Sequence, residues 1–267
     1  MNPLFDVLSD GAVVAKRNLI KIKRVPDLMV FTLISPIMFV LLFAYVFGGS
    51  IEIPGVNYRE FLIAGVFAQT VIFGATFSGA GIADDMQKGV IDRFRSLPMS
   101  RSAVLVGRTG SDIFNNVLSL AVMSATGLAV GWRVRTSPLE ALGGFLLILL
   151  FAYAISWIMA YVGLLVPTPE VVNNASFMVI FPITFIANTF VPSESLPTVL
   201  RTFANWNPVS SVTQAARELF GNVNPTAPPP DVWSLQHPVL YTLLWVGIIL
   251  AVFIPLSVRK YQQASSR

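Results

Sequence analysis

Residues able to act as nucleophiles, metal ligands or phosphate binders are few in this chain, and their spacing matches no catalytic pattern. The 267 residues include no cysteine and a single histidine, His237, which excludes disulfides and thiolate chemistry. A phosphate-binding P-loop needs a lysine directly after a glycine, and none of the five lysines follows one. We therefore expect no catalytic, metal or cofactor site in this chain, and we interpret His237 as an interfacial residue.

The charged residues that a coupled carrier would need are also scarce within the apolar stretches. Carriers driven by protons or ions place Asp, Glu, Arg or His deep in the membrane. Here Arg108 and Asp112 are four residues apart, a spacing that suits an acid–base pair near a helix end. The energy for any transport must then come from outside the chain, or the protein is a passive channel or an assembly subunit.

The composition requires a lipid phase around the elements that carry these residues. Hydrophobic residues make up 54% of the chain and charged residues 12%, whereas soluble domains carry about 25% charged residues. A helix needs about 20 mostly apolar residues to cross a bilayer. Continuous runs of that length favour helices over strands, so we expect an all-α integral membrane protein with six transmembrane helices. The runs are 28–47, 61–83, 112–131, 139–166, 171–191 and 239–258.

The distribution of Lys and Arg predicts the orientation. In a six-span arrangement, thirteen of the eighteen basic residues lie on the side of the two termini, and such an excess marks the cytoplasmic side. We expect residues 1–27 to form a cytoplasmic amphipathic interfacial helix, residues 28–258 the six-span domain, and residues 259–267 a cytoplasmic tail. Within the domain, 84–101 is a cytoplasmic loop and 192–237 is an outer segment.

The N-terminal segment has helical periodicity. Apolar residues recur there at spacings of three and four, with basic residues off that face, which is typical of a helix lying on the inner membrane surface. The alternative is an ordinary amphipathic helix buried against protein. The apolar positions are Phe5, Leu8, Ala12, Ala15, Leu19 and Ile22.

The cytoplasmic loop 84–101 contains a second amphipathic pattern. Acidic residues open it, where a helix dipole favours them, and Pro98 ends it. Met86, Val90, Phe94 and Leu97 form an apolar stripe beside a face that carries Arg93 and Arg95. A short helix of this kind either lies on lipid or docks in the groove of a partner protein.

A group of aromatic and amide residues lies in the second and fifth runs. Aromatic surface with few polar groups suits an apolar or amphiphilic cargo, whereas the alternative is lipid-facing or core phenylalanine. The candidates for a substrate path are Gln69, Phe73, Phe77, Phe181, Phe185 and Asn188. Small residues at every fourth position, such as Ala75, Gly79 and Ala83, predict close helix packing.

Several motifs in this order resemble type-2 ATP-binding-cassette (ABC) transporter permeases of the daunorubicin/doxorubicin-resistance type. They are the segment 89–101, Gly107-Arg108 with Asp112, the segment 58–62 with Gly65, and the segments 190–192, 196–197, 207–210 and 216–220. Two departures are Ala64, where relatives often have proline, and the loop 167–170, which lacks a basic residue that relatives often have.

The resemblance implies a permease subunit in a bacterial plasma membrane, acting in a drug exporter. A separate ATPase subunit would hydrolyse ATP with Mg²⁺ and bind the helix 86–97 as a coupling helix, and a second permease copy would complete the complex. It further implies re-entrant helices in the outer segment and a path for hydrophobic cargo lined by the first, second and fifth spans. The alternatives are export of polysaccharides or lipid-linked glycans, and a membrane scaffold without transport; no nucleic-acid partner is expected.

Overall fold

The chain folds into helices throughout the part that the structure describes. This computed structural model describes residues 10–18, 20, 26–48, 51, 53, 55–95, 102–224 and 230–263, with the side chains at 26–33, 47, 92, 94 and 95 outside the description. These ranges hold no β-strand, which confirms the all-α class. Residues 10–18 are helical. The further helices are α2 (Pro26–Leu42), the π-helical turn η1 (Phe43–Phe47), α3 (Tyr58–Gln87), α4 (Val90–Arg95), α5 (Ala103–Val130), α6 (Pro138–Leu165), α7 (Pro169–Phe185), the 3₁₀ turn η2 (Ser193–Ser195), α8 (Thr198–Trp206), α9 (Pro208–Phe220), α10 (Trp233–Gln236) and α11 (Pro238–Gln263).

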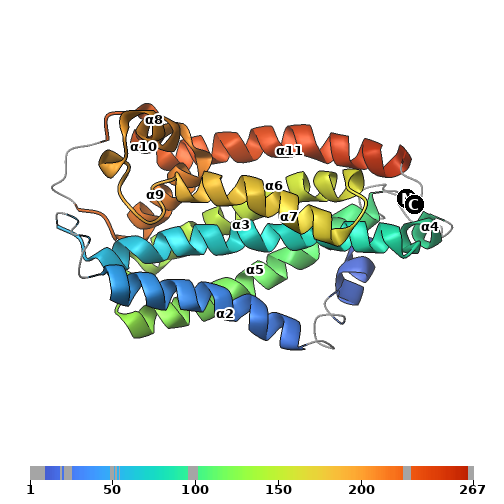
Figure 1. Cartoon of the computed structure of the whole chain (residues 1–267), viewed down its shortest axis with the longest axis horizontal. Coiled ribbons are helices and arrows are strands. Elements are labelled where there is room, and N and C mark those ends of the chain that lie inside the picture. Colours follow the sequence, from blue (N-terminus) through green and yellow to red (C-terminus); the bar gives the residue numbers. More distant parts are fainter. Residues whose placement is uncertain are drawn as a thin grey trace.

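The long helices form one elongated bundle with distinct ends (Figure 1). The short helices α8, α9 and α10 gather at one end, while α4 and the C-terminal end of α11 lie at the other. The charge distribution predicts that the end with α4 is cytoplasmic. That orientation stays a prediction.

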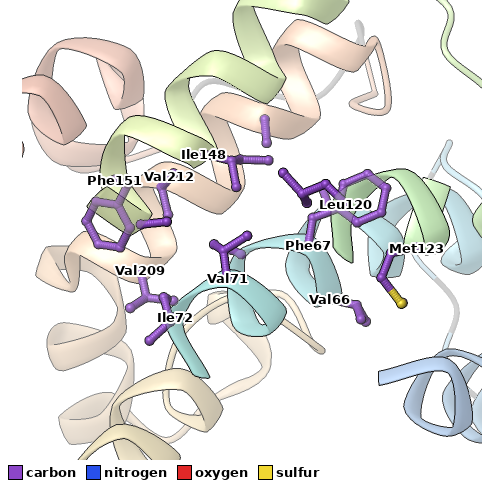
Figure 2. Close-up of a cluster of buried hydrophobic side chains, with 14 of the residues drawn as sticks. Val66, Phe67, Val71, Ile72, Leu120, Met123, Ile148, Phe151, Val209 and Val212 are labelled. Atoms are coloured by element: carbon purple, nitrogen blue, oxygen red, sulfur yellow. The ribbon is translucent and has the colours of Figure 1, made fainter. Parts of the chain in front are cut away.

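Helix α3 is the centre of the bundle and packs against α5, α6, α7 and α9. Most of its length is buried, including Phe67 and Val71. Figure 2 shows these side chains meeting Ile148 and Phe151 of α6 and Val212 of α9. Because 72% of its apolar window is buried inside the protein, α3 is covered mainly by its neighbouring helices.

Four described helices are long and apolar enough to cross a membrane: α3, α5, α6 and α11. Each overlaps one of the expected apolar runs. The run 28–47 corresponds to α2 followed by η1, and the run 171–191 corresponds to α7. Helices α2 and α7 are shorter, with 17 residues each. The count of six spans therefore stays a prediction.

Local chemistry explains where the helices begin and end. Ser137 caps α6 in a reciprocal box, since its Oγ accepts from the amide of Glu140 while the Glu140 carboxylate accepts from the Ser137 amide. Helix α5 ends at Gly131, whose φ of +111° suits only glycine without strain. The structure begins α5 at Ala103, nine residues before the apolar run at 112. Its first turn is apolar and buried within the chain, since Val104 and Leu105 pack in a cluster with Ile82 of α3.

The small residues at positions 75, 79 and 83 bring α3 close to α6, as their spacing predicts. A Cβ placed on Gly163 of α6 would lie 2.3 Å from the carbonyl oxygen of Gly79. Backbone therefore approaches backbone at this crossing, and no flexible side chain can move aside.

Replacing Gly163 with alanine is expected to destabilise the bundle by about 1–3 kcal/mol, because the added methyl group forces the two backbones apart. Thermal unfolding of the detergent-solubilised protein measures the effect. Gly247→Ala is the matched control, since a Cβ at that position in α11 meets nothing within 4 Å. Equal melting temperatures for the two variants would contradict the close approach.

Candidate transport path and coupling end

Phenylalanine rings stack along one side of α7. Phe177, Phe181 and Phe185 are spaced by four residues and therefore share a face of the helix. The ring centroids of Phe177 and Phe181 are 5.1 Å apart, and those of Phe181 and Phe185 are 4.1 Å apart. Phe73 of α3 joins the row at Phe177, with 6.0 Å between centroids.

The row continues to the first helix through the segment after α7. Phe190 lies 4.7 Å from Phe185 and 4.6 Å from Phe43 of η1, measured between ring centroids. Phe43 in turn stacks on Phe39 of α2 at 6.0 Å. We call this set the aromatic column; it consists of Phe73, Phe177, Phe181, Phe185, Phe190, Phe43 and Phe39. Stacked and tilted ring pairs at these separations attract one another and form a continuous apolar surface.

The structure brings together three of the six residues predicted for the path, namely Phe73, Phe181 and Phe185. Phe77 is 40% exposed and makes no ring contact with the described aromatic residues, so it does not belong to the column. Gln69 is buried in α3, one turn before Phe73. Asn188 is buried after the end of α7 and is held by its backbone rather than by its amide group.

A buried arginine organises the chain where α7 ends. The run 171–191 predicts a helix to Val191, but α7 stops at Phe185, and the freed carbonyl groups need donors. Arg217 of α9 supplies them: its Nη2 donates to the carbonyl oxygens of Asn188 at 2.7 Å and Thr189 at 3.1 Å. Its Nε donates to the carbonyl oxygen of Phe61 at 2.9 Å.

The same arginine ties α9 to the start of α3. Its guanidinium carbon lies 3.4 Å from the centre of the Phe61 ring, a cation–π arrangement. The backbone of α3 approaches this segment closely, since a Cβ on Gly65 would lie 2.1 Å from the carbonyl oxygen of Thr189. Arg217 thus fixes the segment that carries Phe190, and with it the place where the column passes from α7 to η1.

Sequence reasoning missed four members of the column and the part played by Arg217. Phe39 with Phe43, and Phe177 with Phe181, each have the spacing of four that would have marked them. Arg217 falls on the apolar face of α9, eight residues after Val209, which signals a buried cation. Phe190 has no such signal, because it lies in a turn.

The structure interrupts the apolar stripe that the sequence predicts over residues 86–97. The sequence predicts one helix over 86–97, but α3 ends at Gln87, Lys88 caps it, and Gly89 adopts a φ of +66° before α4 begins. Glycine just past a helix end is the usual way to turn the chain. Met86 therefore belongs to the last turn of α3 and is buried inside this chain, at 5% exposure, which removes it from any partner surface.

Among the described side chains of α4, that of Ile91 anchors the helix to the bundle. Ile91, which is 1% exposed, packs in a cluster with Met86, Leu105 and Tyr261. Val90 is half-buried and Arg93 is exposed. The side chains of Phe94 and Arg95, and all of Leu97, lie outside the described residues. The contacts of this group with an ATPase stay a prediction.

A charged pair marks the junction before α4. Lys88 Nζ lies 2.7 Å from Asp84 Oδ1, one helical turn earlier. The hydrogen bond to Asp84, and then its negative charge, raise the pKa of Lys88 above its ordinary value. Lys88 therefore stays cationic at neutral pH.

The N-terminal segment packs against the same end of the bundle. Gly11 and Val14 lie against Gly107 of α5, where a Cβ on Gly107 would be 2.6 Å from the Cβ of Val14. The buried face of residues 10–18 holds Gly11, Val14 and Asn18, whereas Ala12 of the predicted apolar face is exposed. The face differs because glycine in α5 admits Val14. Phe5, Leu8, Leu19 and Ile22 lie outside the described residues.

Two polar contacts secure that packing. Arg17 Nη2 lies 3.0 Å from Asp85 Oδ1 at the end of α3, and Asn18 Nδ2 donates to Ser111 Oγ at 3.3 Å. Residues 10–18 are thereby joined both to α3 just before α4 and to α5 just after it.

The segment 192–237, where the resemblance implies re-entrant helices, contains the short helices α8, α9 and α10. Helix α8 leaves an apolar face uncovered by the described chain, with Val199 81% exposed and Phe203 and Trp206 each 49% exposed. Tyr241 of α11 donates to the carbonyl oxygen of Trp206 at 2.9 Å. Aromatic rings at the end of a span are typical of the membrane interface.

Comparisons with known proteins place these features in a family. The model of the ABC-2 type transporter family matches residues 11–220. The chain is 32% identical to a daunorubicin resistance ABC transporter permease protein of Streptomyces coeruleorubidus, over 94% of this chain and 85% of that protein. It is 24% identical to a probable doxorubicin resistance ABC transporter permease protein of Mycobacterium tuberculosis, over 88% and 81% of the two chains. A putative transport permease of Cyanophora paradoxa is also 24% identical, over 82% and 76%.

Proposed function

This chain belongs to the ABC-2 type transporter family, and on that premise we propose that it is the permease subunit of an exporter for hydrophobic or amphiphilic drugs or lipid-like compounds. The aromatic column carries the proposal. It is a continuous run of stacked rings joining α2, α3 and α7, the helices of the first, second and fifth apolar runs. Such a surface binds flat or apolar molecules without directional hydrogen bonds.

The proposal includes a second copy of the permease facing the column. Helix α7 packs mainly on α3 and leaves a wide face uncovered by its own chain. Phe177 is 55% exposed, and Met178 and Val179 beside it are exposed as well. A partner copy and the cargo would cover this face, so that the path lies between two protomers. Six spans and cytoplasmic termini complete the proposed arrangement.

The energy source in this proposal is a separate ATPase subunit. The chain has no P-loop lysine, so ATP and Mg²⁺ would be bound by the partner. The partner would contact α4 and the residues after it, where Val90, Arg93, Phe94, Arg95 and Leu97 are the proposed contacts. Met86 is withdrawn from that set because its side chain is buried in this chain.

The first experiment is to purify this chain in detergent from its native membrane and assay what accompanies it for ATPase activity. We expect a roughly stoichiometric ATP-binding subunit whose hydrolysis rate changes when daunorubicin is added. A chain that is isolated alone, with no associated ATPase, would reject the exporter proposal in favour of a scaffold.

Shortening two rings of the aromatic column tests the path. Phe181→Ala with Phe185→Ala removes the closest ring pair, so we expect the apparent affinity for daunorubicin, measured as half-maximal ATPase stimulation, to fall at least about tenfold. Phe114→Ala is the matched control, since Phe114 of α5 is 54% exposed and makes no ring contact with the described aromatics. Equal affinities in the two variants would place the cargo elsewhere.

A further inference from the structure

Arg108 reaches from α5 across to the backbone of α3. Its Nη2 donates to the carbonyl oxygen of Phe77 at 2.7 Å. In an α-helix the carbonyl of residue 77 points toward residue 81, so a donor that approaches it must pass over residue 81. That residue is Gly81, and a Cβ there would lie 1.8 Å from Nη2 and 2.1 Å from the guanidinium carbon of Arg108. The guanidinium therefore rests on bare backbone that only glycine provides.

The local acid–base pair that the sequence suggests forms no ion pair or hydrogen bond in the structure, although the charge of Arg108 is near enough to act on Asp112. Asp112 is one turn from Arg108 on α5 and is 3% exposed, but its Oδ2 has no hydrogen-bond partner among the described residues. Nη2 of Arg108 instead donates to the backbone of the neighbouring helix α3. A charge-assisted bond to a backbone carbonyl joins two elements, whereas a pair within one helix would join none.

A second polar side chain of α5, that of Asn116, also lies beside a glycine of α3. A Cβ placed on Gly74 would lie 2.6 Å from Asn116 Oδ1, closer than real Cβ contacts allow. Gly74 and Gly81 are seven residues apart on α3, and Asn116 and Arg108 are eight apart on α5, in the opposite order. Arg108 thus lies against Gly81, and Asn116 lies against Gly74. If α5 slid along α3 by one turn, these two polar side chains would meet side chains of α3 instead of glycines.

The seated arginine lies between the coupling end and the aromatic column. Arg108 is in the second turn of α5, soon after the chain returns from α4, and Phe77 is one turn from Phe73, the first ring of the column. The contacts of Arg17 with Asp85 and of Asn18 with Ser111 bind the same helix ends. Residues 17 and 18 thus join α3 and α5 at the end of the bundle that carries α4.

We propose that Arg108, seated on Gly81, is a positioning residue that transmits displacement of the coupling end to the turn of α3 that carries Phe73. The proposal rests on the exporter function proposed above. It assigns Arg108 no contact with cargo. Its effect is on the coupling between cargo and ATP hydrolysis, and the binding of the ATPase does not depend on it.

The test uses the complex of this chain with its ATPase, purified from its native membrane, and daunorubicin as the probe. Gly81→Ala displaces the guanidinium without altering any charge, because the atom it meets is the end of a flexible side chain. Arg108→Ala removes the donor. We expect each variant to lower daunorubicin-stimulated ATP hydrolysis about tenfold, while co-purification, basal hydrolysis and melting temperature stay at control values. Gly110→Ala in α5 is the control, since a Cβ there meets nothing within 4 Å.

The double variant shows whether Gly81 and Arg108 act through their mutual contact or independently of each other. If Gly81 serves only to admit Arg108, Gly81→Ala with Arg108→Ala should lose no more stimulation than either change alone. Additive losses, or stimulation in Gly81→Ala equal to that of Gly110→Ala, would overturn the assignment. So would a fall in stimulation matched by a fall in melting temperature. Failure of the exporter proposal itself would be seen in the unaltered chain, as no associated ATPase, and would overturn both.

Discussion

Replacing Arg217 with methionine is expected to destabilise the protein by about 3–5 kcal/mol. The side chain is 1% exposed and donates to three backbone carbonyl groups, those of Phe61, Asn188 and Thr189. Methionine fills a similar volume but donates no hydrogen bond, so three buried acceptors would lose their partner, each at a cost of about 1–3 kcal/mol before relaxation. Arg217→Lys should be intermediate, because an ammonium group cannot reproduce the planar fork.

Thermal unfolding in detergent, followed by loss of helical circular dichroism, measures this effect. The control is Arg201→Met in α8, where an exposed arginine donates to the carbonyl oxygens of Glu194 and Leu196 at the surface. Water can replace those bonds, so the control should change stability by well under about 1 kcal/mol. Equal melting temperatures for the two variants would mean that the carbonyls after α7 find other donors.

Reversing the charge of Arg93 together with Arg95 is expected to abolish communication with the ATPase while leaving the spans folded. Arg93 is exposed on α4 and forms no part of the apolar cluster that anchors this helix through Ile91. If α4 contacts the ATPase as proposed, two glutamates there would face like or unmatched charge, which costs several kcal/mol at an interface. We expect daunorubicin transport and stimulated ATP hydrolysis to fall at least about tenfold.

The control for charge reversal is the basic pair at the end of α11. Arg259→Glu with Lys260→Glu changes the same net charge at the same end of the bundle (Figure 1), away from α4 in the chain. Phe94→Gln provides a second, uncharged probe of the predicted stripe. Transport equal to that of the unaltered chain in both Arg93/Arg95 and Phe94 variants would reject α4 as the coupling element.

Much of the architecture follows from local sequence. Long apolar runs require helices because a backbone in lipid must satisfy its own hydrogen bonds, and each expected run contains a described helix. Capping residues such as Ser137 and Asn207, and glycines such as Gly131, set ends of helices by contacts within a few residues. The family could also be recognised from motifs, because they are contiguous segments whose order is preserved.

The ends of helices are harder to predict from the sequence than the helices themselves. The stripe from 86 to 97 has good helical spacing, yet Gly89 turns the chain between α3 and α4. Gly89, directly after Lys88, is a helix-stop signal, but the apolar periodicity continues across it and predicts an unbroken helix. The end of α7 at Phe185 had only Pro182 as a hint, since the termination depends on donors that arrive from α9.

What the sequence by itself determined was therefore the helical class, the approximate positions of the long helices, the charge distribution and the family. Tertiary structure alone decided which phenylalanines join into a column, and that Phe77 does not. It also decided where Arg108 and Arg217 are directed. Both donate to backbone carbonyls, and every residue carries one, so residue type gives no signal of the acceptor. Only the packing of α3 against α5 and α9 selects which carbonyl groups those two arginines reach.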